Sequence, residues 1–155
     1  RRAMMRLRMT DGKLIWSKNV FEVGQQGGAV YPHWFTASEG RIFGLGKAWD
    51  SSTGKPLWEH PLPGSDLTAV RLIDQLKGVQ RTYPVRPTAR GDRVYFPTMN
   101  GQLRALDCAT GRPLWIWRIG PGQAARALAQ DEYLIASTLR RVVCLRRESS
   151  VKDAN

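Results

Sequence analysis

The chain has 155 residues, of which 42% are hydrophobic and 24% charged, and its 24 basic and 13 acidic side chains give a net charge of +11. It contains no apolar run long enough to span a membrane as a helix, no signal-peptide pattern and no motif for reading DNA or RNA. A strongly basic chain suggests an acidic partner. However, the surplus gathers at the two ends, in Arg1, Arg2, Arg6 and Arg8 and in the five bases from Arg140 onward. We therefore interpret most of this charge as solvated surface.

A short pattern recurs three times along the chain. Residues 105–120 read ALDCATGRPLWIWRIG, residues 47–64 read KAWDSSTGKPLWEHPLPG, and residues 8–16 carry a weaker copy, RMTDGKLIW. The two longer copies share Asp, two further residues, Thr-Gly, a basic residue and Pro-Leu-Trp. Such recurrence indicates that one supersecondary unit is stacked several times. The repeat predicts architecture better than function, because a stacked scaffold can host many unrelated activities.

Taken in chain order, the first expected element is the last strand of one unit, over residues 13–18. The second unit covers residues 29–62, with strands expected near residues 33–37, 41–45, 47–50 and 56–60. A partial fourth unit covers residues 124–147, with strands expected near residues 125–128, 132–138 and 141–145. Its segment 131–145 aligns with residues 92–106 of the third unit.

The third unit, over residues 83–120, has the clearest strand pattern. Residues 94–98 alternate with the period of two that is typical of a strand. Turns are expected at Asn-Gly 100–101 and Thr-Gly 110–111, since Asn-Gly is a strong hairpin signal and glycine accepts a positive φ. Pro113 cannot donate a hydrogen bond to a neighbouring strand, so we expect it to begin an edge strand.

One segment between the second and third units departs from the repeat and predicts a short helix over residues 66–77. Ser65 is a suitable N-cap, and Gly78 is a suitable stop. Apolar residues follow at the three-to-four spacing of a helix, namely Leu67, Val70, Ile73 and Leu76. Insertions in repeat proteins often carry function, but an amphipathic helix that covers a blade is the simpler interpretation.

The third unit also resembles a known family. Residues 91–115, GDRVYFPTMNGQLRALDCATGRPLW, are similar to G-x-V-Y-x-x-T-x-x-G-x-L-x-A-L-D-x-x-T-G-x-x-x-W, the repeat of pyrroloquinoline-quinone-like β-propellers. The resemblance implies an all-β fold whose blades are four-stranded antiparallel meanders. The family includes quinone-dependent dehydrogenases and non-enzymatic propellers, such as the lipoprotein that helps to assemble outer-membrane barrels. It therefore implies a periplasmic or cell-envelope location.

The number of units predicts an incomplete ring. Closed propellers have about four to eight blades, whereas residues 1–155 supply about three, as a single partial domain. We expect the chain to be part of a larger propeller. The alternative is a homodimer in which two copies close one ring, each first strand completing the other's last blade.

The repeated residues are expected to be structural. They are Trp16, Trp58 and Trp115, Gly12, Gly54 and Gly111, and Asp50 and Asp107. A tryptophan at a repeated position buries a large apolar area and is expected to wedge between adjacent blades. The family resemblance implies that its ring packs over a neighbouring turn glycine. The aspartates are expected to accept hydrogen bonds from the Thr-Gly turn rather than to act as bases.

No catalytic constellation is evident. His33 and Trp34, near an inner strand, are weak candidates for a ligand site, with a packed aromatic as the simpler interpretation. Cys144 is expected to be a small buried apolar residue and Cys108 to lie near a turn, and neither forms a metal cluster with His60 or His33. No cofactor is evident, and pyrroloquinoline quinone with calcium is expected only if blades outside this chain supply the site.

Three functions remain open. The favoured one is a non-enzymatic propeller scaffold that binds a protein partner and no nucleic acid. The first alternative is part of a quinone-dependent dehydrogenase whose active site lies in other blades. The second is a binder of anionic polymer through its terminal arginines, whose binding would weaken strongly with salt.

Overall fold

The computed structural model describes residues 3–19, 35–44, 46–60, 86–98, 101–120, 124–138 and 141–146. Every regular element in these residues is a β-strand, and none of them forms a helix that could cross a membrane. The prediction of an all-β fold is therefore confirmed. The helix expected over residues 66–77, together with His33 and Trp34, lies outside the described residues.

Four antiparallel sheets follow one another along the chain, and we call them the first to fourth blades. The first holds β1 (Ala3–Leu7) and β2 (Leu14–Asn19). The second holds β3 (Phe35–Ser38), β4 (Arg41–Gly44), β5 (Lys47–Asp50) and β6 (Pro56–Glu59). The third holds β7 (Thr88–Arg90), β8 (Arg93–Pro97), β9 (Gln102–Asp107) and β10 (Pro113–Arg118). The fourth holds β11 (Ala124–Gln130), β12 (Tyr133–Thr138) and β13 (Val142–Arg146).

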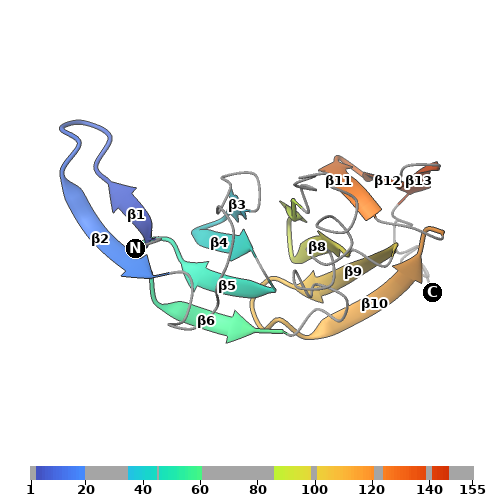
Figure 1. The fold of residues 1–155 in the computed structure, drawn as a ribbon, viewed down its shortest axis with the longest axis horizontal. Coiled ribbons are helices and arrows are strands. Elements are labelled where there is room, and N and C mark those ends of the chain that lie inside the picture. Colours follow the sequence, from blue (N-terminus) through green and yellow to red (C-terminus); the bar gives the residue numbers. More distant parts are fainter. Residues whose placement is uncertain are drawn as a thin grey trace, which may run out of the picture.

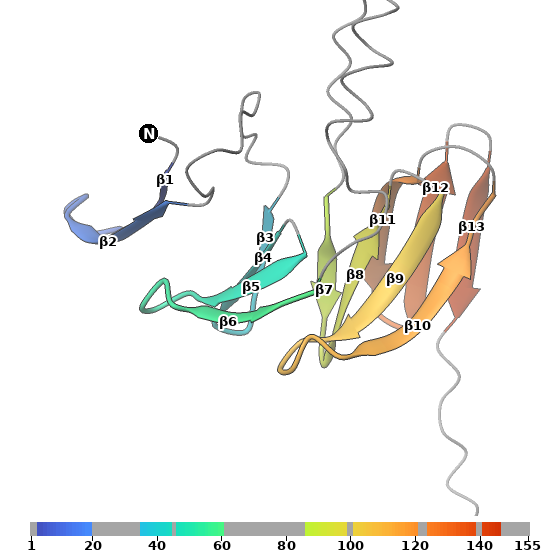
Figure 2. The ribbon, with the colours of Figure 1, turned by 60° about the horizontal axis from the view of Figure 1, so that its bottom comes forward.

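Each blade is a meander, because strands that follow one another in the chain are hydrogen-bonded neighbours. The blades stand side by side along an open arc, and the strands β2, β6 and β10 follow its outer side (Figure 1). The same succession is visible in Figure 2, where β7 lies between the second and fourth blades. The inner strand β7 contacts both β3 and β11. In Figure 1 the described strands form an arc that does not close into a ring.

The first blade contains one strand more than the sequence predicted. Residues 13–18 were expected to supply a single strand, but β1 pairs with β2 and places Arg6 opposite Trp16. The sequence signal for β1 is weak because its residues, AMMRL, neither alternate nor follow a turn motif. The first blade thus corresponds to the last two strands of a complete blade.

The fourth blade corrects the alignment of residues 131–145 with residues 92–106. The β11–β12 turn places Gln130 opposite Tyr133, as the β7–β8 turn places Arg90 opposite Arg93. Tyr133 is therefore equivalent to Arg93, one position away from the expected partner. The loop between β12 and β13 is one residue shorter than the loop between β8 and β9. The alignment expected from the sequence therefore holds again in β13. A shift of one residue exchanges the two faces of a strand, so Leu134 rather than Tyr133 faces the third blade.

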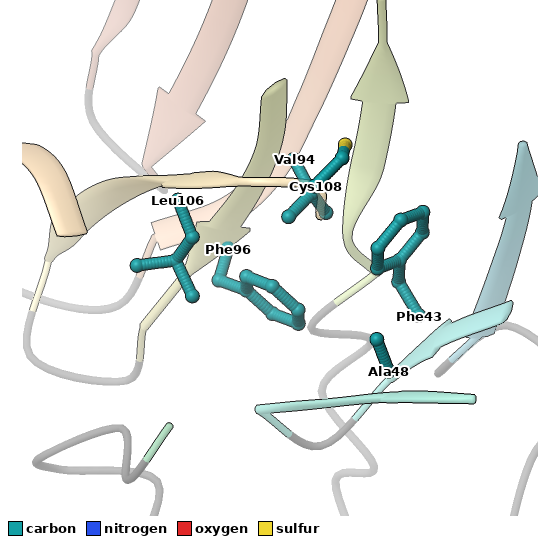
Figure 3. Close-up of a cluster of buried hydrophobic side chains, with 6 residues drawn as sticks. All are labelled: Phe43, Ala48, Val94, Phe96, Leu106 and Cys108. Carbon is teal, nitrogen blue, oxygen red and sulfur yellow. The ribbon is translucent and has the colours of Figure 1, made fainter. Parts of the chain in front are cut away.

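The core lies between blades rather than within any one of them. One buried cluster joins Phe43 and Ala48 of the second blade to the third blade (Figure 3). The residues that the third blade contributes are Val94, Phe96, Leu106 and Cys108. A second cluster joins the other face of the third blade to the fourth, and it contains Tyr95, Leu103, Ala105, Ile119, Leu134 and Ala136. Because both faces of the third blade are covered, β8 and β9 are almost continuously buried, Arg104 included.

Candidate functional site

The repeated residues meet at the boundaries between blades, where each blade ends in the same turn and bulge. The N–H of Gly54 donates to the carbonyl of Asp50 at 2.8 Å, and that of Gly111 to the carbonyl of Asp107 at 2.9 Å. Both glycines have positive φ, +68° and +72°. A side chain in this left-handed conformation is strained, so the turn requires glycine for its backbone alone.

The aspartate side chains close these turns. The Oδ1 atom of Asp50 accepts hydrogen bonds from the N–H of Thr53 at 2.7 Å and from its hydroxyl at 2.8 Å, and Ser52 donates to the same oxygen. The hydroxyl of Ser52 is the largest cause that lowers the pKa of Asp50 to about 2. Thr110 lowers the pKa of Asp107 in the same way. Because these carboxylates are held as charged acceptors, they are poorly suited to act as bases.

The first blade builds the same turn with different side chains. The N–H of Gly12 donates to the carbonyl of Arg8 at 2.8 Å, and Gly12 has a φ of +69°. Asp11 replaces the threonine and accepts from the N–H of Lys13 at 3.1 Å, where Thr53 accepts from Lys55 at 3.3 Å. Arg8 forms an ion pair with Asp11 at 3.2 Å. The weakest copy of the repeat therefore keeps the backbone geometry of the other two.

A bulge in each last strand directs the tryptophan toward the next blade. Register shifts precede Trp16, Trp58 and Trp115 and leave Ile15, Leu57 or Leu114 without a cross-strand partner. Bulges of this kind change the direction of a side chain. The bulge recurs at the same place in all three blades, so it is part of the repeated unit.

Two of the tryptophans bind the turn of the following blade. The indole N–H of Trp16 donates to the carbonyl of Ser51 at 3.1 Å, and that of Trp58 to the carbonyl of Cys108 at 3.0 Å. A Cβ on Gly54 would lie 2.8 Å from the ring of Trp16, and one on Gly111 would lie 2.6 Å from the ring of Trp58. We call each such contact a tryptophan joint. The joint needs glycine for space as well as for backbone conformation.

The third tryptophan has no described joint. Trp115 is half-buried and its ring centroid lies 5.8 Å from that of Tyr95 in its own blade. The residue of the fourth blade equivalent to Cys108 is Arg147, which lies outside the described residues. In the first blade, no ring covers the turn glycine, since a Cβ on Gly12 would meet nothing within 4 Å.

The cysteines and histidines do not form a reactive cluster in the described part of the chain. Cys108 is buried in the first cluster, and desolvation raises its pKa to about 11. Cys144 is exposed, which corrects the expectation that it is buried. It occupies the place of the buried Ala105, but no described strand covers this face of the fourth blade. The backbone N–H of His60 donates to Gly46 at 2.7 Å.

The described residues do not fit a bound metal or a calcium-dependent quinone. They contain no group of three or more His, Cys, Asp or Glu side chains that could hold a metal ion. The repeated acidic residues Asp50 and Asp107 already accept hydrogen bonds from their own turns. We therefore derive no chemistry through such a cofactor from these residues.

Apolar side chains are exposed along the outer strands of the arc, a feature that the sequence analysis did not identify. We call this surface the outer rim, and it consists of Leu14, Ile15, Leu57 and Ile116. These residues lie on β2, β6 and β10, which follow one another in Figure 1. Ile15 and Leu57 are the bulged residues next to the joint tryptophans. The bulge thus turns the tryptophan inward and leaves the preceding residue exposed to solvent. This exposure could not be predicted from the sequence, because it depends on the strand register.

Comparison with known proteins places the chain among β-propellers. The family model described as outer membrane protein assembly factor BamB matches residues 4–151. The chain is 41% identical to BamB of Aliivibrio fischeri over 64 residues, which cover 41% of this chain. It is 28% identical to 1-butanol dehydrogenase (quinone) of Thauera butanivorans over 108 residues, which cover 70% of this chain. Each match spans only 15% of the relative's own length.

Two solved structures share the fold. BamB from Moraxella catarrhalis superimposes with a TM-score of 0.59 at 17% identity, over 93% of this chain and 40% of that one. The computationally designed Ika4 protein superimposes with a TM-score of 0.64 at 12% identity, over 95% of this chain and 81% of that one. At these identities the likeness concerns the fold alone.

Proposed function

Because the chain belongs to the BamB family of β-propellers, we propose that it is a non-enzymatic scaffold of the cell envelope that binds other proteins through its outer rim. The relative from Aliivibrio fischeri is named as an outer membrane protein assembly factor. We propose the same role for the protein to which this chain belongs.

The outer rim carries this proposal. Leu57 and Ile116 are 46% and 52% exposed, and each stands next to a repeated tryptophan, Trp58 or Trp115. Exposed apolar side chains recur on the last strand of three successive blades, and exposed apolar surface is a feature of interaction sites. Because each of these side chains is already about half buried, burying the rest against a partner contributes about 1 kcal/mol. Next to Ile15 and Leu57, the joints of Trp16 and Trp58 fix the last strand to the following blade, so a partner meets a surface that is already ordered there.

The test replaces the gene in its own organism with variants of the rim. Leu57→Glu and Ile116→Glu are expected to reduce in-cell crosslinking of the protein to envelope partners and to lower the amount of assembled outer-membrane barrel proteins. Gln130→Glu is the control, because Gln130 is exposed at the β11–β12 turn of the fourth blade, away from the rim. The proposal fails if the rim variants fold normally and retain full crosslinking and barrel assembly.

A second candidate is a segment of a quinone-dependent dehydrogenase. It is favoured by the 28% identity to the butanol dehydrogenase, which extends over more of this chain than the match to the BamB relative. The catalytic residues would then lie in other parts of the full-length protein. Purified full-length protein that binds pyrroloquinoline quinone in the presence of Ca²⁺, and reduces a dye with an alcohol as substrate, would favour this candidate over the scaffold.

A further inference from the structure

The guanidinium of Arg104 is a buried charge without a counterion in the described part of the chain. Arg104 is 8% exposed, and its Nη2 atom donates to the side-chain oxygen of Gln102 at 3.1 Å. Its Nε atom is buried and has no hydrogen-bond partner. None of the ion pairs among the described residues includes Arg104. An arginine keeps its charge in a protein, and a buried charge is costly unless an opposite charge pairs with it.

Arg104 lies on the face of the third blade that is turned toward the second blade. It stands two residues before Leu106 in β9, and side chains two positions apart in a strand share a face. Its partner on β8 is Phe96, and both Leu106 and Phe96 belong to the cluster shared with the second blade. Its partner on β10 is Ile116, a residue of the outer rim. Arg104 therefore lies between the inter-blade core and the rim.

The second blade shows how the equivalent charge is neutralised. Lys47 corresponds to Arg104, because each precedes the alanine that pairs with the repeated tryptophan. The strand partner of Lys47 is Glu59, and their side chains form an ion pair at 3.0 Å. In the third blade Ile116 stands in the place of Glu59. The third blade thus keeps the basic side chain and lacks the carboxylate that goes with it.

A second unpartnered nitrogen belongs to the neighbouring blade. The Nε2 atom of His60 is buried and has no hydrogen-bond partner. His60 follows β6 two positions after Trp58, on the side of the strand that is turned toward the third blade. The remaining atom of this kind, Nε of Arg93, belongs to a side chain that has an ion pair with Asp92 at 3.7 Å. Buried polar atoms are normally partnered, so Arg104 and His60 indicate that a polar ligand binds where their blades meet.

We propose that Arg104 binds a carboxylate of the protein that docks on the outer rim, an inference that rests on the proposed function. The side chain of a partner's Asp or Glu takes the place that Glu59 holds in the second blade, and an apolar neighbour of that residue packs on Ile116. Arginine pairs with carboxylates through parallel hydrogen bonds, and the Nε–H is a free donor for one of them.

The pairing of charge with apolar surface defines the partner. A phosphate would also pair with arginine, but Ile116 beside the charge favours a protein segment, which supplies an acidic and an apolar side chain together. A purely apolar segment is selected against, because it would cover Arg104 and leave the charge unpaired. The site therefore contributes specificity, whereas the exposed rim residues contribute apolar area.

The first experiment tests whether the charge is unpaired within the protein itself, by urea unfolding of the purified full-length protein. Arg104→Met is expected to raise the urea concentration at half-unfolding, because an apolar side chain of similar size replaces an uncompensated buried charge. Lys47→Met is the matched control and should shift it little, because the partly exposed pair with Glu59 contributes little to stability. An Arg104→Met variant that unfolds at clearly lower urea overturns the proposal.

The same assay tests the place assigned to the carboxylate. Ile116→Glu returns to the third blade the acidic residue that the second blade has in Glu59. It is expected to raise the urea concentration at half-unfolding in the wild-type background and not in Arg104→Met. An equal effect in the two backgrounds would show that a carboxylate at this place does not reach Arg104, and would overturn the geometry.

The second experiment measures in-cell crosslinking to envelope partners, as for the rim variants. Arg104→Gln is expected to lower the crosslinked yield about tenfold or more, because removing one member of a buried charge pair weakens binding strongly. Lys47→Gln is the matched control and should crosslink like the wild type. Full crosslinking by Arg104→Gln overturns the carboxylate site. If Leu57→Glu loses crosslinking in the same assay, the rim function stands, so the two failures are distinguishable.

A third measurement identifies the ligand. Arg104→Lys keeps the positive charge and supplies an amine, which a water-soluble carbodiimide joins to a contacting carboxylate as an amide. In carbodiimide-treated envelopes, mass spectrometry is expected to find this amine linked to an Asp or Glu of another protein. Lys47 linked to Glu59 of the same chain is the positive control. Loss of crosslinking in Arg104→Gln without such an amide in Arg104→Lys would identify a different anion and overturn the assignment to a carboxylate.

Discussion

The indole N–H of Trp58 donates a hydrogen bond across a blade boundary to the carbonyl oxygen of Cys108, 3.0 Å away. The ring of the same tryptophan covers Gly111, three residues further along the turn. One side chain therefore satisfies its polar atom and buries its apolar surface on a single turn of the next blade. The same relationship joins Trp16 to Ser51 and Gly54, so this contact recurs at two successive blade boundaries.

Replacing Gly111 with alanine is expected to destabilise the protein through two separate effects. The positive φ costs an alanine about 1–2 kcal/mol, and the added Cβ, 2.6 Å from the ring of Trp58, costs about 1–3 kcal/mol more by overpacking. Gly12→Ala is the matched control, because Gly12 has the same φ and no neighbour within 4 Å. Urea unfolding should show a clearly larger loss for Gly111→Ala. Equal losses would mean that the ring moves aside without cost.

Replacing Trp58 with phenylalanine is expected to remove the hydrogen bond to Cys108 while keeping most of the aromatic packing. The lost bond leaves a carbonyl unpaired in a half-buried site, so the free energy of unfolding should fall by about 1 kcal/mol. Trp115→Phe serves as the comparison, because no acceptor for the indole of Trp115 lies among the described residues. A larger loss for Trp115→Phe than for Trp58→Phe in thermal unfolding would contradict this assignment.

Asp50 is expected to make stability depend on acid pH. Its pKa lies at about 2 in the folded chain and at its ordinary 3.8 when free, because Ser52 and Thr53 donate to the carboxylate. A carboxyl with a lowered folded pKa stabilises the fold above its unfolded pKa, and that contribution is lost as the pH falls from 3.8 toward 2. Asp50→Asn cannot titrate, so its stability deficit relative to the wild type should shrink across this range. A deficit that is constant with pH would show that the charge plays no part.

The two cysteines are expected to differ in reactivity toward an alkylating reagent. Cys144 is exposed, whereas Cys108 is buried and its pKa is raised to about 11 from 9.0. A rise of two units lowers the thiolate fraction about a hundredfold, and the thiolate is the reacting species. Mass spectrometry of the native protein should find the label on Cys144, and Cys144→Ser should remain unlabelled until it is unfolded. Rapid labelling of Cys108 in the native chain would contradict its burial.

The repeat made the turns and the outer strands predictable because their requirements are local. Asp50 and Thr53 lie three residues apart and complete one turn by themselves, and Pro113 begins an outer strand because it lacks a donor. The weak third copy near Trp16 was sufficient to predict β2. By contrast, β1 has no local signal, and it is held by pairing with β2.

The register of β12 and the exposure of Cys144 could not be predicted for a different reason. The alternating apolar residues of β12 are compatible with either face, and a loop one residue shorter than its counterpart was enough to misplace them by one position. Cys144 and Ala105 occupy equivalent positions in similar strands, yet one is exposed and the other buried. Their difference depends on whether another blade covers the face.

The sequence by itself determined the unit of this protein: a meander with a glycine turn and an outer strand that carries the repeated tryptophan. Those features depend on backbone conformation and on residues a few positions apart, so a single copy contains all the information needed to recognise them. Only the tertiary structure decided which faces of the described strands are buried, where the last strands bulge, and which apolar residues form the outer rim. Burial is a relation between blades that are distant in the chain, and no property of one blade specifies its neighbour.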